Sequence, residues 1–237
     1  MWLGTLWRRL AVNSSRVHLT RYNEMFARMV PAGALVLDAG SGSQPYRHLF
    51  GHARYESADF EMADKGYAPS TYVCDLTEIP VENERFDFVV FNQVLEHLPE
   101  PKSVLVELNR VLKRGGRIIC TAPLAYEEHE IPYDFYRYTQ FAHRYLFEQA
   151  AFRVDRLEWM EGYFGTVAYQ LDTAARYLPM RPHEIAPGLL GFVLSPAMVF
   201  LKGFFALTAL AFYRMDARAP FKQRGYPKNY VIIASKP

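Results

Sequence analysis

Short apolar runs separated by turn residues recur along the chain from about residue 34 onward. Such runs are typical of buried strands, and seven of them lie at 34–38, 54–59, 71–75, 86–91, 116–122, 152–159 and 230–235. Apolar residues recur at helical spacing from Pro101 until a Gly-Gly pair at 115–116 stops the helix, and a second helical stretch spans 138–151. This alternation predicts an α/β fold, with a doubly wound, mostly parallel seven-stranded sheet covered by helices on both faces.

Two segments fall outside the alternation of strand and helix signals, one before the first predicted strand and one between the sixth and the last. We therefore divide the chain into an N-terminal helical segment (1–30), a core (31–161 together with 227–237) and an apolar helical insertion (162–226). The insertion precedes the last strand of the core.

The insertion contains two runs without any charged residue, at 185–201 and 203–213, with Lys202 between them and Pro196 inside the first. The first run is marginally short for a bilayer-spanning helix and the second is far too short. A single span through both would place Lys202 deep in lipid, which is costly. We therefore expect a helical hairpin, either covering a ligand pocket of the core or lying in a membrane interface.

The first ten residues carry an amphipathic pattern that favours the membrane interpretation. Apolar residues recur at helical spacing, whereas two arginines fall off that face: Trp2, Leu3, Leu6, Trp7 and Leu10 against Arg8 and Arg9. This is typical of an interfacial helix, and further basic residues follow from Arg214 onward. The arginines interrupt the apolar run that a signal peptide needs. We expect a cytoplasmic protein in peripheral contact with the inner face of the membrane; the alternative is packing on its own core or in a homodimer.

Composition narrows the classes of protein further. Half of the residues are apolar, which argues against global disorder, and the net charge of +2 gives no reason to expect a nucleic-acid partner. Cys74 and Cys120 end apolar or β-branched runs and are expected to be reduced, buried thiols. The chain has no CxxC or HExxH spacing, so we expect no metal.

The clearest chemical signal is the turn after the first predicted strand, where Asp38 is followed by Gly40 and Gly42. Glycines at these positions let the backbone pass close to a ligand, and the next helix adds amide donors. The pattern is weak alone, because many nucleotide-binding folds share a glycine-rich first turn.

Polar residues at later strand ends strengthen that signal. Asp59 ends the second predicted strand, where a carboxylate can accept hydrogen bonds from both hydroxyls of a ribose. Asp75 ends the third, where it can accept a hydrogen bond from an adenine amino group or cap the following turn. Asn92 and Gln93 follow the fourth strand. The carboxyl ends of parallel strands meet at one edge of a sheet, which is where open α/β folds bind ligands.

These residues resemble the class I S-adenosylmethionine-dependent methyltransferases over roughly residues 33–160. VLDAGSGSQPY is similar to the first motif of that family, and the segment from CDLTEIP to GGRIICTAP is similar to its central signature. Gln44 stands where many members carry a third glycine, and we do not interpret this departure as a loss of activity. The resemblance implies that S-adenosylmethionine is the cofactor and is contacted by Asp38, Gly40, Ser41, Gly42, Tyr46, Asp59, Phe60, Asp75, Leu76, Asn92, Gln93 and Val94.

The segment EEHEIPYDFYRYT, after the fifth strand, resembles one that borders the acceptor pocket in a subgroup of the family. The resemblance implies an acceptor pocket formed by His97, His129, Tyr133, Tyr136 and Arg137. His129 is the predicted catalytic base, because its unperturbed pKa suits a base near neutrality. The alternative is structural: the aromatic residues pack, Asp134 pairs with Arg137, and Thr139 caps the next helix.

We therefore expect a methyltransferase that acts on a small lipophilic or lipid-linked acceptor. One alternative is a catalytically silent binding or scaffold protein that retains the fold. A dinucleotide-dependent oxidoreductase is a third possibility, against which the missing full GxGxxG pattern argues.

Overall fold

The computed structural model describes residues 14–62 and 66–237. The chain divides into two compact units. The core unit comprises Leu19–Met160 and Asn229–Pro237, and the described residues of the helical unit are Ser14–His18 and Glu161–Lys228. The predicted interfacial helix at residues 1–10 lies outside the described residues, and it stays a prediction.

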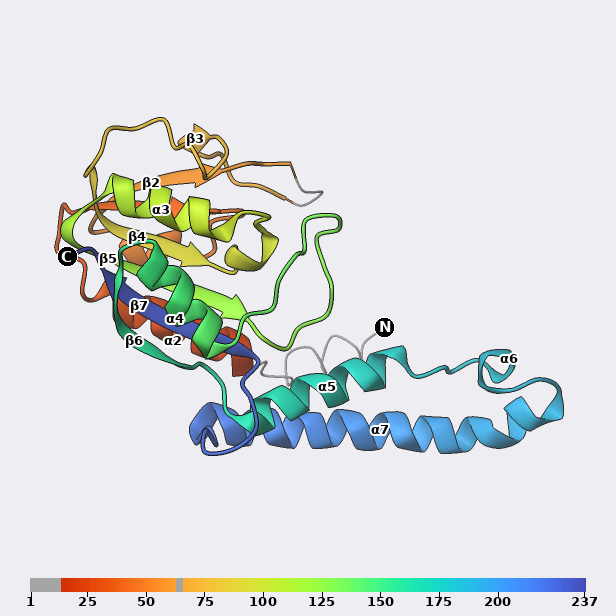
Figure 1. Cartoon of the computed structure of the whole chain (residues 1–237). Coiled ribbons are helices and arrows are strands. Elements are labelled where there is room, and N and C mark those ends of the chain that lie inside the picture. Colours follow the sequence, from red (N-terminus) through yellow and green to blue (C-terminus); the bar gives the residue numbers. More distant parts are fainter. Residues whose placement is uncertain (1–13, 63–65) are drawn as a thin grey trace. The chain divides into compact units, whose positions relative to one another are not determined.

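A seven-stranded sheet forms the centre of the core unit (Figure 1). Its strands are β1 (Leu35–Ala39), β2 (Arg54–Asp59), β3 (Tyr72–Val73), β4 (Phe86–Asn92), β5 (Leu112–Pro123), β6 (Arg153–Trp159) and β7 (Asn229–Ser235). Their order is β3-β2-β1-β4-β5-β7-β6, and β7 alone runs antiparallel to its two neighbours. The predicted fold class, a mostly parallel seven-stranded sheet, is confirmed.

Apolar residues on both faces of the sheet explain why the strands read as nearly continuous hydrophobic runs. On β1, Leu37 faces a cluster that includes Leu105 of α3 (Pro101–Val111) and Phe147 of α4 (Gln140–Gln149). The next residue back, Val36, faces a second cluster with Phe26 of α2 (Ser14–Ala27). Figure 1 shows α3 and α4 in front of the sheet and α2 behind it. The sheet is therefore buried between two helical layers.

Two boundaries differ from the sequence prediction. The strand predicted at 71–75 is only Tyr72–Val73, because the chain turns at Asp75, whose Oδ1 accepts a hydrogen bond from the Thr77 amide at 2.8 Å. The pair Gly115–Gly116 does not stop α3 but lies inside β5, which starts directly after that helix. A Cβ on Gly116 would lie 2.9 Å from the Asp87 carbonyl oxygen, so glycine permits the close strand contact at this irregular register.

The helical unit contains α5 (Tyr163–Tyr177), α6 (Pro182–Ile185) and α7 (Leu189–Arg218). The predicted hairpin of the two uncharged runs is wrong, because the single helix α7 contains residues 189–201 of the first run and all of the second. The antiparallel partner of α7 is instead α5, and Phe164 packs on Phe212 with 5.2 Å between ring centroids (Figure 1).

The chain reverses before α7 rather than within it. Gly188 has φ +63°, and a Cβ on Gly191 would lie 2.0 Å from the Pro182 carbonyl oxygen, so glycines make the tight turn from α6 into α7 possible. Lys202 forms helices well and does not break α7, which also continues through Pro196. The turn signal was Pro187-Gly188, near the start of the first uncharged run.

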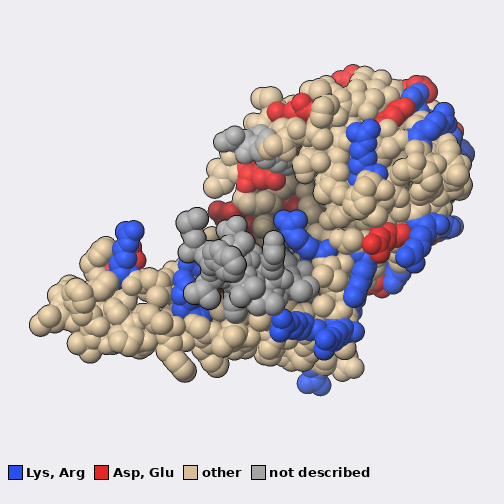
Figure 2. Space-filling model, turned by 180° about the vertical axis from the view of Figure 1, so that it is seen from behind, with Lys and Arg blue, Asp and Glu red and all other residues tan. Residues whose placement is uncertain are grey.

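Most of α7 is apolar and exposed. It is long and apolar enough to cross a membrane, with a mean hydropathy of 1.8 over an 18-residue window of which 6% is buried. The large exposed side chains include Leu189, Leu190, Phe192, Val193, Val199, Phe200, Phe204 and Leu207. Figure 2 shows the far end of this unit as largely uncharged surface with one small group of charged side chains.

Candidate active site

A cavity of about 530 Å³ opens at the carboxyl ends of β1, β2 and β4 in the core unit. Its wall includes Gly40 after β1, Asp59 at the end of β2, and Gln93 with Val94 after β4. This is the edge where parallel sheets bind ligands, and the volume lies in the range of small-molecule sites.

The turn after β1 requires glycine for two separate reasons. Gly40 has φ +69°, and a Cβ there would lie 2.4 Å from Cγ2 of Val94. Gly42 has φ +50° but open space around the position of a Cβ. Gly40 is therefore required by both packing and backbone conformation, whereas Gly42 is required by conformation alone.

Gln44 occupies the position at which many family members carry a third glycine. Its φ is +54°, the left-handed conformation that glycine adopts most easily. The side-chain amide donates hydrogen bonds to Ser57 Oγ at 3.2 Å and to the Pro69 carbonyl at 2.9 Å. These bonds hold the left-handed turn in place, so the departure from the family pattern leaves the path of the backbone intact.

Asp59 connects the glycine-rich turn to the end of β2. Its Oδ2 accepts the Gly42 amide at 2.7 Å, and its Oδ1 accepts the Glu61 amide at 3.0 Å. The side chain is buried yet lines the cavity. Each carboxylate oxygen has a further lone pair, so Asp59 can still accept two hydroxyl groups from a ligand.

Asp38, the acid that ends the first motif's strand, lies inside the fold and is not among the residues that line the cavity. Its carboxylate accepts a hydrogen bond from the Tyr55 hydroxyl. Burial raises the pKa of Asp38 to about 7, the Tyr55 hydrogen bond opposes the rise, and the charge of Asp59 adds to it. The ionisation of Asp38 is therefore expected near neutral pH.

Asp75 both caps a turn and lines the cavity. Its Oδ1 accepts hydrogen bonds from the amide and the hydroxyl of Thr77, each at 2.8 Å. The buried side chain of Leu76 lies beside it in the cavity wall. The capping and ligand-binding interpretations of Asp75 are thus compatible.

Three residues at the end of β4 have two different roles: Asn92, the last residue of the strand, is structural, and Gln93 and Val94 line the cavity. Asn92 Nδ2 donates to Asn23 Oδ1 at 2.7 Å, and Asn92 Oδ1 accepts the Thr121 hydroxyl at 3.0 Å. Asn92 therefore links α2, β4 and β5. Gln93, at φ +56°, turns the chain so that it and Val94 line the cavity.

Asp134 and Arg137 form the pair that the structural alternative predicts. Arg137 donates to both carboxylate oxygens of Asp134, at 2.6 and 2.8 Å, and also to the Glu127 carbonyl at 3.0 Å. Hydrogen bonds from Arg137 lower the pKa of Asp134 to about 2. Thr139 Oγ1 accepts the Ala142 amide at the start of α4. These residues fix the shape of the loop.

His97 and Tyr133 bring that loop to the cavity. His97 lies on the short 3₁₀ helix η2 (Leu95–His97), and its Nδ1 bonds to the Tyr133 carbonyl. Both residues line the cavity. His129 lies behind them, with its ring centroid 4.6 Å from that of His97, and Tyr136 donates its hydroxyl to the Pro99 carbonyl.

The structure thus divides the predicted site residues into two groups. Those that line the cavity are Gly40, Asp59, Phe60, Asp75, Leu76, Gln93, Val94, His97 and Tyr133. Those that do not are Asp38, Ser41, Gly42, Tyr46, Asn92, His129, Tyr136 and Arg137. Sequence reasoning missed Met62, Tyr67, Thr77, Leu98, Pro99, Glu100, Ser103, Val104, Glu130 and Phe135. Most of these residues lie on loops or at the start of α3, where periodicity carries no signal.

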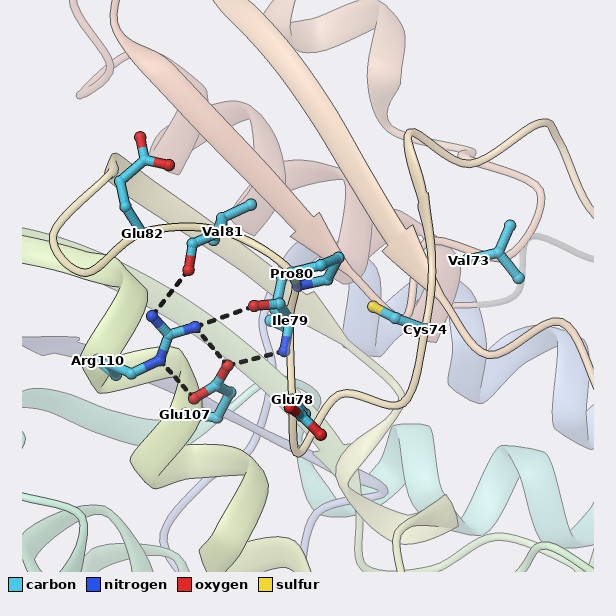
Figure 3. A pocket seen from close by; sticks show the side chains of 9 residues that line it. All are labelled: Val73, Cys74, Glu78, Ile79, Pro80, Val81, Glu82, Glu107 and Arg110. Atoms are coloured by element: carbon cyan, nitrogen blue, oxygen red, sulfur yellow. Dashed lines mark hydrogen bonds and ion pairs between the residues drawn. The ribbon is translucent and has the colours of Figure 1, made fainter.

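A second hollow beside β3 has a structural explanation (Figure 3). Arg110 donates to both oxygens of Glu107 and to the carbonyls of Ile79 and Val81, all between 2.7 and 3.0 Å. Glu107 in turn accepts the Ile79 amide at 2.7 Å. The charged groups at this hollow hold the loop before β4 in place rather than facing a ligand.

Comparison with known proteins finds a family match within the core unit. Residues 37–120 match the family described as methyltransferase domain. The ubiquinone/menaquinone biosynthesis C-methyltransferase UbiE of Desulfotalea psychrophila is 32% identical over 102 residues, covering 38% of this chain and 42% of that protein. The demethylmenaquinone methyltransferase of Chlamydia caviae is 27% identical over 107 residues, covering 40% and 46%. This chain therefore matches less than half the length of these relatives.

Solved structures share the fold over most of the chain. A SAM-dependent methyltransferase from Archaeoglobus fulgidus has a TM-score of 0.52 at 16% identity, covering 92% of this chain and 93% of that one. The [4+2]-cyclase SpnF has a TM-score of 0.55 at 17% identity, covering 92% and 81%. At such identities the likeness shows the fold alone, and the same fold supports different reactions.

Proposed function

We propose that this chain, which belongs to the class I S-adenosylmethionine-dependent methyltransferases, transfers a methyl group from that cofactor to a small acceptor. The observation that carries the proposal is the cavity at the carboxyl ends of β1, β2 and β4. There the glycine-rich turn, the acid that ends β2 and the segment after β4 converge on one space.

The residues around this cavity fit the cofactor. At the glycine-rich turn, the hydroxyl of Ser41 is buried without a hydrogen-bond partner among the described residues. Asp59 would hold the ribose hydroxyls, while Asp75 and Leu76 would contact the adenine. Asp38 does not reach the cavity, and it would influence the methionine moiety of the cofactor electrostatically, through the glycine-rich turn. Bound in this way, S-adenosylmethionine supplies a methyl group activated by a sulfonium.

The remaining lining of the cavity supports a lipophilic acceptor. Besides the predicted cofactor-binding residues, the lining includes Met62, Leu98, Tyr133 and Phe135, which are apolar or aromatic residues of the kind that bind small organic molecules. The relatives named above are called quinone-pathway methyltransferases, and a further relative from Hahella chejuensis is called malonyl-[acyl-carrier protein] O-methyltransferase. Lipophilic or carrier-linked acceptors are consistent with this lining.

We propose that the imidazoles of His97 and His129 accept the proton that leaves the acceptor during methyl transfer. His97 reaches the cavity, whereas the predicted base His129 lies behind it in ring contact. A proton leaving the acceptor would therefore pass His97 before it reaches His129. Tyr133 fixes the orientation of the His97 ring through its carbonyl.

We further propose that the protein works in the cytosol at the membrane surface, in contact with lipid through residues 1–10 and α7. The support is the apolar surface of α7 together with basic residues at its end and beyond it, Arg214, Arg218, Lys222 and Arg224. Basic side chains near apolar surface favour anionic lipid. A homodimer would cover the same surface, and binding to vesicles distinguishes the two arrangements.

Calorimetry with S-adenosylmethionine and S-adenosylhomocysteine tests the core of the proposal. We expect binding to the full chain, and Asp59→Ala should weaken it by about 1–3 kcal/mol because ribose hydroxyls lose their acceptor. The matched control is Asp155→Ala, which changes an acid on β6, away from the residues that line the cavity. Binding of NAD without a response to either methionine-derived ligand would contradict the assignment.

A further inference from the structure

Glu96, on η2, is the most unusual buried group near the cavity. Its side chain is 0% exposed, and neither carboxylate oxygen has a hydrogen-bond partner among the described residues. A buried carboxyl group without partners is costly unless something compensates it.

Two imidazoles stand next to this carboxyl group. Nε2 of His97 lies 3.8 Å from Oε1 of Glu96, and His129 completes the group. One ligand atom from each of the three residues lies within 4.8 Å of the other two. Carboxylate and imidazole are both common ligands of divalent metals.

Each imidazole is also held by a second partner, as metal-bound histidines usually are. Nδ1 of His97 bonds to the Tyr133 carbonyl. Nδ1 of His129 lies 3.1 Å from the Glu127 carbonyl and 3.4 Å from Oδ2 of Asp134. These contacts orient both rings before any ligand binds.

We infer that Glu96, His97 and His129 form a binding site for one divalent transition-metal ion of the Zn²⁺ class. One carboxylate oxygen and two imidazole nitrogens suit such an ion better than Ca²⁺ or Mg²⁺, which prefer oxygen ligands. The ion would coordinate the buried carboxylate of Glu96, whose two oxygens accept no hydrogen bond from the described residues. The ligands come from η2 and from the loop after β5, so no close sequence spacing announced them.

The position of the site gives the ion a role, and this step rests on the proposed methyl transfer. Three protein ligands leave a coordination position open, and His97 places the ion at the wall of the cavity. With the ion bound, both imidazoles serve as its ligands instead of accepting the acceptor's proton, and the ion lowers the pKa of a coordinated hydroxyl group. The favoured acceptor is therefore one with a hydroxyl or enol oxygen, which becomes easier to ionise on the metal.

Metal binding by the full chain tests the inference without any activity measurement. After treatment with a chelator, the protein is titrated with ZnCl₂ by calorimetry, and separately with CoCl₂ while visible absorption is recorded. We expect one ion per chain, and we expect Glu96→Gln and His129→Gln each to weaken binding at least 100-fold. His48→Gln, an exposed histidine on the 3₁₀ helix η1 (Arg47–Phe50), is the control and should bind normally.

Several outcomes would overturn the site. Absence of stoichiometric binding, or binding unchanged in His129→Gln, would show that Glu96 is simply a neutral buried acid. If Glu96→Gln fails to fold, His129→Gln decides, because His129 is partly exposed and circular dichroism can confirm its fold. Cofactor affinity, measured in the same variants, should stay unchanged. Metal binding without cofactor binding would refute the proposed function and leave the metal site standing.

Discussion

Replacing Gly40 with alanine should test whether the glycine-rich turn is held by packing against the segment after β4. The new Cβ would lie 2.4 and 2.6 Å from the two methyl carbons of Val94, at a φ of +69°. Left-handed backbone costs a non-glycine residue about 1–2 kcal/mol, and overpacking adds about 1–3 kcal/mol. Gly40→Ala should therefore lower the free energy of unfolding by about 2–5 kcal/mol.

Gly42→Ala is the matched control for this substitution. Its φ is also positive, but a Cβ there meets no atom within 4 Å, so only the conformational cost of about 1–2 kcal/mol remains. The double variant Gly40→Ala/Val94→Ala removes the two closest contacts, leaves Cβ of residue 94 at 3.1 Å and keeps the strain, so it should recover part of the loss caused by Gly40→Ala.

Urea denaturation, followed by circular dichroism, measures these differences for the wild type, both glycine variants, Val94→Ala and the double variant. A double-mutant cycle should give a coupling energy of about 1–3 kcal/mol between Gly40 and Val94. Equal losses for the two glycines, or no coupling with Val94, would refute the packing argument and leave only the backbone requirement.

Three further predictions follow from charge and exposure. Burial raises the pKa of Asp38 to about 7, so the wild type loses stability as pH rises from about 4 to 7. Relative to the wild type, Asp38→Asn should therefore have a free energy of unfolding higher by up to about 4 kcal/mol at pH 8, but by less than about 2 kcal/mol at pH 5. Hydrogen bonds from Arg137 lower the pKa of Asp134 to about 2, which stabilises the fold above pH 4. Arg137→Ala should therefore lower the free energy of unfolding by about 2 kcal/mol at pH 7, and by less as the pH falls towards 2. Phe200 on α7 is 74% exposed, and Phe200→Ser should weaken sedimentation with anionic vesicles about tenfold.

Each of these predictions has a control. Thermal unfolding across pH should show opposite trends for the two charge variants, and parallel curves for variant and wild type would contradict the pKa argument. In the vesicle assay, Phe141→Ser removes an equally exposed aromatic from α4 of the core unit and should leave binding unchanged. Equal effects of the two phenylalanine variants, or no binding by the wild type, would contradict lipid contact through α7.

The sequence alone determined the elements whose signals are local. Hydrophobic runs bounded by turns placed the seven strands within a few residues, and β2 matched at both ends. The acid at the end of β2 and the glycines after β1 announced the ligand edge, because parallel strands bring their carboxyl ends together. These features depend on neighbours along the chain, which a sequence displays directly.

The tertiary structure decided everything that depends on residues distant in the sequence. Uncharged runs show that a segment avoids water but not where it turns, so only the structure revealed that α7 is continuous and pairs with α5. Likewise, the loop after β5 was recognisable, yet its division into Arg137, which braces Asp134, and Tyr133, which lines the cavity, required the folded chain.

Glu96 is the clearest example of a feature that the sequence could not reveal. In the sequence it is one acid beside a histidine, and such residues are usually solvated. Only the folded core buries its carboxyl group and brings His129 next to it, from a loop that follows a different strand. Local patterns therefore determined the sheet and its ligand-binding edge. Long-range packing decided which polar groups are buried from solvent and which of them contact another polar group.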